Sequence, residues 1–458
     1  MDSLLQKYKE WLEEVSLNEP TLGSEDKDVI LSEGLQTSLA NIASFVVEAH
    51  STPETRKDLL GGYSEVRSAS LLQSLQPFLL QVENFWVQPK TQTGPPGSHP
   101  LITLVGRFFV LAQLETRLAV KVLPSPLTGE AVRRALKGTT EMIQQCVSTL
   151  GDRLRRALGK HEFYEQIAIL DAVESCNDLY VEHSAATSPI RDVSLMLMPA
   201  IKTLTSAAVD LLKALMDDFQ DVHRTTSPPP ANATVYGPTS SLMNCLKRIM
   251  VFERIAEALL SKWAQPDWNG LLGLVPAEPS IFAMALYYQD ILKGLEGLLE
   301  RQSCMYRRPM VSALFQLNNY NYIVKTFRSC SMAELLTLES QKKYQCIVDS
   351  LLSDYLLGWQ ALGALLDEAV ESRAGGMTAK ERLKTFSADL DETVQSQANC
   401  AVPDLQLRGI LLSRIRDLLL PTFVAFYNRN QSLFVASHTR VRLDPGALDG
   451  ALNKLFQA

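Results

Sequence analysis

The sequence LFQLNNYNYIVKTF, residues 314–327, determines the fold that we expect for the rest of the chain. Its apolar side chains recur at the three- and four-residue steps of one helix face, at Leu314, Leu317, Tyr320, Val324 and Phe327. Beside them, Asn318, Asn321 and Lys325 form a second stripe. Asn is a mediocre helix former because its amide competes for backbone partners, so clustered asparagines indicate amides that bond a neighbouring backbone. We predict a partly buried helix whose asparagines have a structural role.

The composition is that of an ordinary soluble globular protein. The 458 residues are 46% apolar and 21% charged, and such a chain can bury a large core in two to four structural units. No run of 18 apolar residues occurs. The most apolar window, Leu101 to Val120, is interrupted by three charged residues, which favours a buried helix over a membrane span. The first ten residues lack the apolar core of a secretory signal, so we expect a cytoplasmic protein.

Seven cysteines occur singly, without a CxxC pair. An odd number of isolated cysteines in a cytoplasmic chain favours reduced, mostly packed thiols over a disulfide framework or a zinc site. These cysteines are Cys146, Cys176, Cys245, Cys304, Cys330, Cys346 and Cys400.

Helical periodicity extends over most of the chain, and no stretch alternates long enough to indicate a strand. We therefore expect an all-α fold of about fifteen helices, arranged as successive antiparallel bundles because most connections are short. Pro77 is expected to kink or split the helix in which it lies. Periodicity leaves open whether the bundles form a globule or a line. The predicted helices span residues 3–15, 28–48, 52 onward, 63–87, 101–123, 128–158, 162–182, 199–222, 239–259, 281–298, 314–327, 331–370, 378–398, 404–429 and 445–456.

The net charge of −7 is unevenly distributed. Residues 1–50 contain ten acidic and three basic side chains, so the remainder of the chain is neutral on balance. Residues 301–345 contain seven basic and two acidic side chains, and residues 401–458 contain seven and four. An excess of this size is usually a solvated surface, which is the default interpretation for both segments.

The common catalytic and metal motifs are missing from the sequence. No two of the six histidines have the i, i+4 spacing of a zinc helix, and His161-Glu162 followed by Glu165 lacks a second nitrogen or sulfur donor. Gly270 to Gly273 lacks the Lys and Ser or Thr of a nucleotide loop, and no GxSxG elbow occurs. We expect no metal, no cofactor and no catalysis. An active site assembled from distant residues is the alternative that the sequence leaves open.

A series of phrases in a fixed order indicates one family. They read TV at 234–235, NNYNYI at 318–323, RLKTF at 382–386, VPDLQLR at 402–408, LPTFVAF at 420–426 and LF at 455–456. Together they resemble the seventy-kilodalton subunit of the exocyst vesicle-tethering complex. The resemblance extends over roughly residues 60–458 and includes Phe109, Leu114 and Glu115.

This resemblance implies a non-catalytic rod of stacked helical bundles that tethers secretory vesicles to the plasma membrane before fusion. Its C-terminal end would bind phosphatidylinositol 4,5-bisphosphate of the inner leaflet, and other surfaces would bind Rho-type GTPases and other exocyst subunits. No nucleic-acid partner is expected. The protein would be cytoplasmic and recruited peripherally to sites of exocytosis. We expect four segments: an acidic one at 1–52, bundles at 53–224 and 225–376, and a bundle with a basic tip at 377–458.

The family's lipid motif is a pair of basic residues three apart, with an aromatic residue between or beside them, ahead of the final helix. Here the segment 438–443 reads HTRVRL, so Arg442 falls on one basic position, Thr439 falls on the other, and the aromatic neighbours are lost. Arginine can bind phosphate through two hydrogen bonds. The expected lipid-binding residues are Arg429, His438, Arg440, Arg442 and Lys454, with Arg429 and Lys454 on the same face. The four Lys and Arg side chains among them would supply about 4 kcal/mol of binding free energy. Stable attachment to the membrane would therefore need simultaneous binding by other subunits or a GTPase.

Other features depart from the family pattern. Tyr236 stands where the family commonly has His, and Ala233 replaces its Gly. Family members usually carry a longer N-terminal coiled coil, whereas only about fifty residues precede the resemblance here. A truncated chain, a divergent member and an incomplete gene product are all open explanations. The lost aromatic residues leave a second function open, a protein-binding scaffold with a decayed lipid site.

Overall fold

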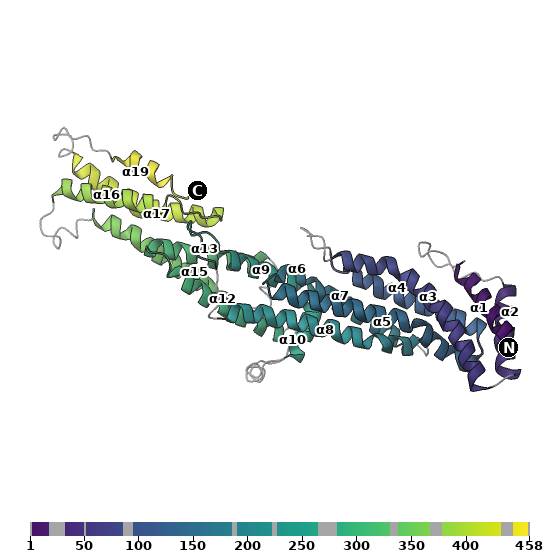
Figure 1. The fold of residues 1–458 in the computed structure, drawn as a ribbon. Coiled ribbons are helices and arrows are strands. Elements are labelled where there is room, and N and C mark those ends of the chain that lie inside the picture. The colour runs from purple at the N-terminus through teal and green to yellow at the C-terminus, as the bar shows by residue number, and fades with distance from the viewer. Residues whose placement is uncertain are drawn as a thin grey trace. The chain divides into compact units, whose positions relative to one another are not determined.

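The computed structural model describes residues 2–17, 33–49, 52–85, 95–185, 190–221, 227–263, 282–329, 338–366, 378–431 and 443–456. Within these ranges the chain forms helices and turns and no strand, which confirms the predicted all-α fold (Figure 1). The helices are α1 Asp2–Leu17, α2 Glu33–Ala49, α3 Pro53–Phe85, α4 Pro100–Val122, α5 Ser125–Leu158, α6 Phe163–Gln166, α7 Ala168–Ser184, α8 Ile190–Gln220, α9 Gly237–Ile249, the 3₁₀ turn η1 Met250–Phe252, α10 Glu253–Lys262, α12 Phe282–Ser303, α13 Pro309–Ser329, α15 Leu338–Ala364, α16 Ala379–Gln397, α17 Leu405–Arg429 and α19 Pro445–Leu452.

The chain divides into two compact units. Unit 1 consists of Met1–Leu215 and Val251–Trp263, and unit 2 consists of Met216–Met250 and Ala264–Ala458. Each unit therefore contains a segment that is separated in sequence from its main part. The four segments expected from the sequence stay a prediction.

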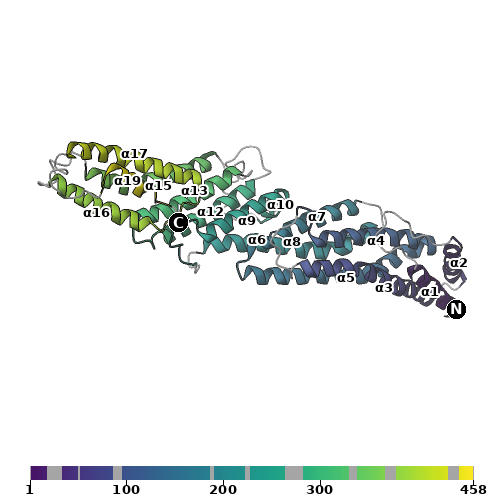
Figure 2. The same ribbon diagram turned by 90° about the horizontal axis from the view of Figure 1, so that it is seen from above.

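Unit 1 is built around its long helices. The helix α3 packs against both α4 and α5, and α1 packs against α3 (Figures 1 and 2). Leu104, Phe108 and Ala112 of α4 are fully buried and lie four residues apart, as on one side of a helix. The most apolar window of the sequence is thus a core helix, as predicted.

Two prolines lie inside helices instead of ending them. The sequence predicts a kink or a split at Pro77; α3 runs without a break through Pro77, which excludes the split. The helix predicted to begin at Pro199 begins nine residues earlier, at Ile190. Pro77 and Pro199 are both exposed. A proline in a helix removes one backbone hydrogen bond, but at an exposed position water can satisfy the freed carbonyl.

By length and composition, α8 is the one helix in the described ranges that could span a membrane, over Arg191–Gln220. Its residues Leu204, Ala208, Leu211 and Leu215 are buried at three- and four-residue steps. A core helix of this length passes the same test, so one such helix is weak support for a membrane span.

Unit 2 is a second set of packed helices. The helix α15 packs against α13 and α17, and α17 packs against α19. Tyr355 and Trp359 of α15 and Phe423 of α17 are fully buried among them. After α19 the chain turns back into this core, where Leu455 and Phe456 are almost completely buried.

The six cysteines within the described ranges are free thiols. Cys176, Cys245 and Cys400 are buried, whereas Cys304 and Cys346 are exposed. Burial raises the pKa of Cys176 and Cys245 to about 12, which keeps both thiols protonated. Cys330 lies outside the described residues.

Candidate functional site

The helix α13 contains the asparagine stretch, and its amides bond neighbouring backbone as predicted. The buried Asn318 donates through Nδ2 to the carbonyl oxygens of Ala233 at 2.8 Å and of Ala401 at 3.0 Å. Asn319 Oδ1 accepts from the backbone N–H of Tyr236 at 2.9 Å. One helix face therefore joins two connecting segments that are distant in sequence.

These two segments also bond each other directly. The Ala401 N–H donates to the Asn232 carbonyl at 2.9 Å. Within the first segment, the Tyr236 hydroxyl donates to the Ser227 carbonyl. Ala233 adopts a left-handed conformation with φ of 54° while fully buried. The resemblance implies Gly at this position, and Gly adopts positive φ without the steric penalty that Ala carries.

Asp404 joins α13 to the start of α17. Its Oδ1 accepts from the Leu407 N–H at 2.8 Å and caps α17, and its Oδ2 pairs with Lys325. Burial would raise the pKa of Asp404, but the hydrogen bonds from Lys325, from the Leu407 N–H and from Asn321 outweigh burial and lower it. The polar stripe predicted beside the apolar one thus positions α17.

Three of the seven basic side chains at 301–345 have acidic partners from other parts of unit 2. The partners are Glu296 for Lys343, Glu392 for Arg308 and Asp404 for Lys325. The basic excess seen in this sequence window is therefore partly neutralised by the fold, so these three cations do not form a free basic surface.

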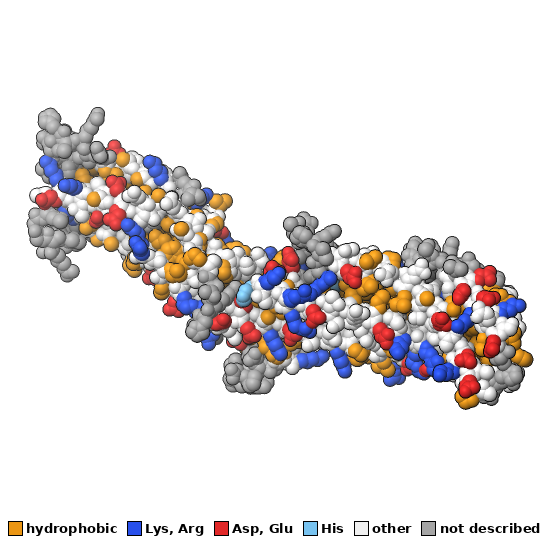
Figure 3. All heavy atoms as spheres, viewed as in Figure 1, with side chains coloured by type: hydrophobic (Ala, Val, Ile, Leu, Met, Phe, Trp, Pro, Cys, Tyr) orange, Lys and Arg blue, Asp and Glu red, His pale blue; other side chains and the backbone are white. Residues whose placement is uncertain are grey.

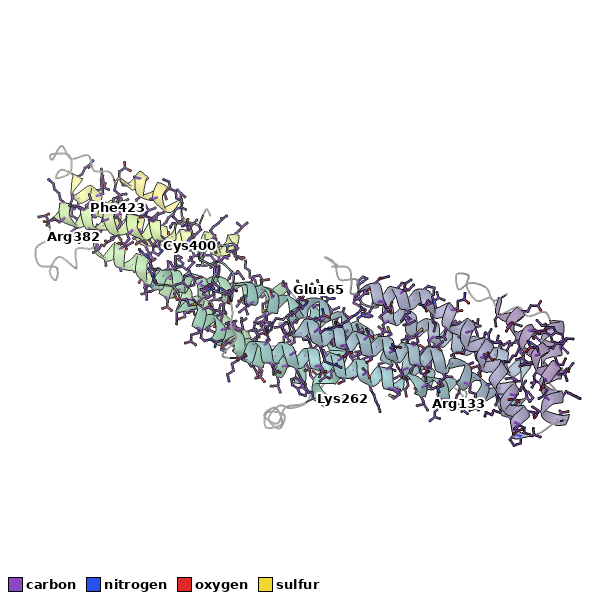
Figure 4. All side chains as sticks on the ribbon, viewed as in Figure 1. Arg133, Glu165, Lys262, Arg382, Cys400 and Phe423 are labelled. Carbon is purple, nitrogen blue, oxygen red and sulfur yellow. The ribbon has the colours of Figure 1, made fainter. Side chains whose placement is uncertain are left out.

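The helices α16 and α17 are antiparallel, so the start of α16 lies beside the end of α17 (Figure 4). Arg382 marks this end: its guanidinium lies 5.6 Å from the ring centroid of Phe426, and its Nε donates to the Leu365 carbonyl at 2.9 Å. We call the exposed cations Lys380, Lys384 and Arg429 the tip cluster. Figure 3 shows Lys and Arg side chains at this end of unit 2, interspersed with acidic ones.

The sequence interpretation did not include Lys380 and Lys384. Both are exposed on α16, four residues apart, and neither has an ion pair or hydrogen bond with another described residue. One sequence signal could have identified them. Two long helices joined by a short connection predict an antiparallel hairpin, which places the first residues of α16 beside the last residues of α17.

Lys454 lies away from the tip cluster. The helix α19 runs back along α17, because Arg416 Nε pairs with Asp449 Oδ1 at 3.0 Å and Arg408 Nη1 donates to the Phe456 carbonyl at 3.4 Å. Lys454 is therefore level with the first half of α17, roughly 20 Å along the helix axis from Arg429. The structure does not bring these two predicted residues onto one face. His438, Arg440 and Arg442 lie outside the described residues.

A buried charge network in unit 1 involves residues to which the sequence interpretation assigned no role. Glu115 of α4 is fully buried and accepts from Arg67 Nε and Nη2 at 3.0 and 2.9 Å, and from the Tyr63 hydroxyl at 2.6 Å. Arg67 Nη1 also donates to Ser16 Oγ of α1 at 2.9 Å. Burial and the nearby carboxylate of Glu115 raise the pKa of Tyr63 well above its usual value, so its hydroxyl stays a donor. The network links α1, α3 and α4, and its core of Tyr63, Arg67 and Glu115 is buried.

The described ranges contain no cluster of three or more His, Cys, Asp or Glu side chains that could hold a metal ion. His161 lies in the exposed turn after α5, with φ of 61°, and not in a helical ligand pair. Unit 2 carries exposed cations on its helices, and such side chains can bind an anionic surface.

Residues 100–454 match the family model that describes the C-terminal part of Exo70, a component of the exocyst complex. The chain is 21% identical over 343 residues to exocyst complex component 7 of Homo sapiens, covering 72% of this chain and 46% of that protein. It is 23% identical over 347 residues to exocyst complex component EXO70A1 of Arabidopsis thaliana, covering 68% and 51%. The chain thus spans about half the length of the curated relatives it matches.

Solved structures support the same assignment at the level of the fold. The crystal structure of the S. cerevisiae exocyst component Exo70p superposes with a TM-score of 0.59 at 14% identity, covering 100% of this chain and 88% of that one. A second S. cerevisiae Exo70 structure gives 0.57 with 99% and 86% coverage. The chain belongs to the Exo70 family of exocyst proteins.

Proposed function

We propose that the protein is a non-catalytic exocyst subunit that tethers secretory vesicles to the plasma membrane before fusion. The observation that carries this proposal is the match of residues 100–454 to the Exo70 family, on an all-α fold that also matches solved Exo70 structures. Other exocyst subunits are the partners that this membership implies. The protein would act in the cytoplasm, be recruited peripherally to sites of exocytosis, and need no cofactor.

We further propose that the end of unit 2 formed by α16 and α17 binds phosphatidylinositol 4,5-bisphosphate. The tip cluster supplies three exposed cations there, and His438, Arg440 and Arg442 follow the end of α17 in sequence by nine to thirteen residues. Lys454 lies too far from Arg429 to contact the same headgroup, so its contribution would be small.

The strength of this membrane contact can be estimated from its charges. Each Lys or Arg near an anionic leaflet contributes about 1 kcal/mol, so the tip cluster with Arg440 and Arg442 supplies roughly 5 kcal/mol. This corresponds to a dissociation constant of roughly 0.2 mM before any ordering cost. Attachment would therefore depend on simultaneous binding by other exocyst subunits or a Rho-type GTPase, which raises the effective concentration at the membrane.

Cosedimentation with liposomes tests this assignment. Two reversal variants, Lys380→Glu with Lys384→Glu and Arg440→Glu with Arg442→Glu, should each weaken binding to liposomes that contain the bisphosphoinositide. The matched control is Lys342→Glu with Arg414→Glu, which removes the same charge from exposed positions outside the tip. Tight binding at physiological salt that both reversals leave intact would show that the tip assignment is wrong.

The second candidate function is a protein-binding scaffold of the same fold without a lipid site. The feature that favours it is the lost aromatic residues around Arg440 and Arg442. No sedimentation with anionic liposomes, together with binding to purified exocyst subunits, would support this alternative. Failure of both binding assays would contradict both functions.

A further inference from the structure

The turn between α12 and α13, residues 304–308, presents an unusual combination of exposed side chains. Met305 is 59% exposed, although Met is a side chain that proteins usually bury. Arg301, in the last turn of α12, and Arg307 are also exposed, and neither makes an ion pair or hydrogen bond with another described residue. We call Arg301, Met305 and Arg307 the turn surface.

The backbone of this turn is held firmly in place. Tyr306 donates through its hydroxyl to the Pro230 carbonyl at 2.6 Å, and its ring centroid lies 5.3 Å from that of Phe315. Ser303 accepts at its carbonyl from Ser312 Oγ and at its own Oγ from Gln316 Nε2, at 2.8 and 2.7 Å. A partner would therefore meet side chains on a fixed backbone, so little ordering entropy would be lost on binding.

The charges around the turn favour a partner that carries carboxylates. Arg308, between Arg307 and α13, pairs with Glu392 of α16 at 3.1 Å, so a carboxylate fits against this turn. The pKa of Tyr320 is raised first by burial and then by the carboxylates of Glu296 and Glu300, so Glu300, the acidic residue nearest the turn in sequence, lies close enough to Tyr320 to act on it. An arginine can hold a carboxylate through two parallel hydrogen bonds, and Arg, Met and aromatic residues are enriched at protein interfaces.

The binding affinity that two arginines can supply favours a protein partner over a membrane. Two basic side chains near an anionic leaflet each strengthen binding roughly fivefold, which leaves an affinity in the range of tens of millimolar. An arginine at the centre of a protein interface can account for about thirtyfold or more by itself. A flexible Met side chain can fill an irregular apolar pocket between two such arginines.

We propose that the turn surface is a docking site for an acidic segment of another exocyst subunit, with an apolar pocket that receives Met305. The carboxylates would bind Arg301 and Arg307. This proposal rests on the proposed role of the protein in the exocyst and adds the place and chemistry of one contact.

The experiment measures the affinity of the full chain for purified exocyst that lacks this subunit, by biolayer interferometry. The test variants are Arg301→Glu with Arg307→Glu, and Met305→Asp alone. The matched control is Lys342→Glu with Arg414→Glu, which changes the charge of exposed, unpaired positions in unit 2 by the same amount. Circular dichroism confirms that each variant is folded, and vesicles of phosphatidylcholine with phosphatidylserine serve as the membrane probe.

Both test variants should weaken binding to the complex at least about tenfold, whereas the control stays within about twofold of the unmodified chain. Wild-type affinity in the test variants, or an equal loss in the control, would overturn the proposal. Loss of vesicle binding with unchanged affinity for the complex would show a membrane contact instead. If the unmodified chain does not bind the complex at all, the proposed function itself is wrong. If the unmodified chain and the turn variants bind equally well, only the docking site is wrong.

Discussion

Replacing Asn318 by Leu tests whether the buried amides of α13 hold unit 2 together. The substitution keeps a side chain of similar size but removes the two hydrogen bonds from Nδ2 to the Ala233 and Ala401 carbonyls. Both acceptor carbonyls lie in connecting segments. In the variant, these segments are held to α13 only by contacts other than these two hydrogen bonds. We therefore expect the loss of stability to appear as local opening of these two segments before it affects the rest of unit 2.

The size of this effect follows from the hydrogen bonds. Leaving a buried acceptor without its donor costs about 1–3 kcal/mol. The bond to the Ala233 carbonyl is buried and the bond to the Ala401 carbonyl is only partly buried, so losing both costs roughly 2–4 kcal/mol. Asn318 Oδ1 is itself buried without a partner among the described residues, and removing it recovers part of this cost. We expect a net loss of about 2–3 kcal/mol, which is roughly a 30- to 150-fold increase in local opening.

Native-state hydrogen exchange measures this opening directly. Three backbone amides should exchange faster by that factor: Thr234, which bonds Asn232 within its own segment, Tyr236, which bonds Asn319 of α13, and Ala401, which bonds Asn232 across the two segments. Peptides from α4 in unit 1 are the internal reference and should be unchanged. Exchange accelerated less than about threefold, or accelerated equally in α4, would refute the structural role of Asn318.

Asn321→Leu should also lower thermal stability and leave liposome binding by the folded protein unchanged. Loss of lipid binding without loss of stability would show that residues 314–327 form a lipid-binding site.

Three further substitutions have outcomes fixed by local geometry. Ala233→Gly should raise the melting temperature and stabilise the protein by about 0.5–1 kcal/mol, because the native φ is left-handed; a lower melting temperature would contradict this. Gly294→Ala should destabilise by about 1–3 kcal/mol in thermal unfolding, since a Cβ there would lie against the Phe219 carbonyl. Gly297→Ala, which meets only a flexible arginine end at 3.7 Å, is the neutral control. Asp404→Asn should be less stable than the unmodified protein near neutral pH. The folded-state pKa of Asp404 is lowered, so its contribution is present above the unfolded pKa of about 3.9 and disappears as the pH falls below it. The difference in melting temperature should therefore shrink on acidification, and a constant difference would exclude the ion pair as its source.

The sequence predicts the type of fold and the local role of α13, because both depend on local patterns. Apolar spacing and clustered asparagines within fourteen residues indicate a helix with bonded amides. The acceptors of those amides lie 85 and 83 residues away, so no local pattern identifies them. The prolines at 77 and 199 were misjudged for a related reason: whether a proline ends a helix depends on whether its freed carbonyl faces solvent, which is a tertiary property.

The candidate site was predicted only in part, again because charge in a sequence window differs from charge on a surface. Lys325 and Lys343 add to the basic excess of residues 301–345, yet acids outside that window neutralise them. Lys454 follows the proposed lipid segment closely in sequence, but the antiparallel course of α19 carries it away from Arg429. The same kind of reversal, between α16 and α17, brings Lys380 to the tip.

The cations of this protein fall into two groups with different energetic roles. Arg67 is buried against Glu115, and removing one partner of such a pair costs about 3–5 kcal/mol, so the fold depends on this pair. An exposed ion pair adds less than about 1 kcal/mol, so the lack of an ion pair between Lys380, Lys384 or Arg307 and another described residue costs the fold little and keeps these cations available to an anionic partner. The tip cluster and the turn surface are each too small for tight binding alone. When one assembly engages both, the second contact forms at a high effective concentration, and the two affinities multiply. Loss of either set should therefore reduce membrane attachment of the assembled complex far more than it reduces binding of the isolated chain.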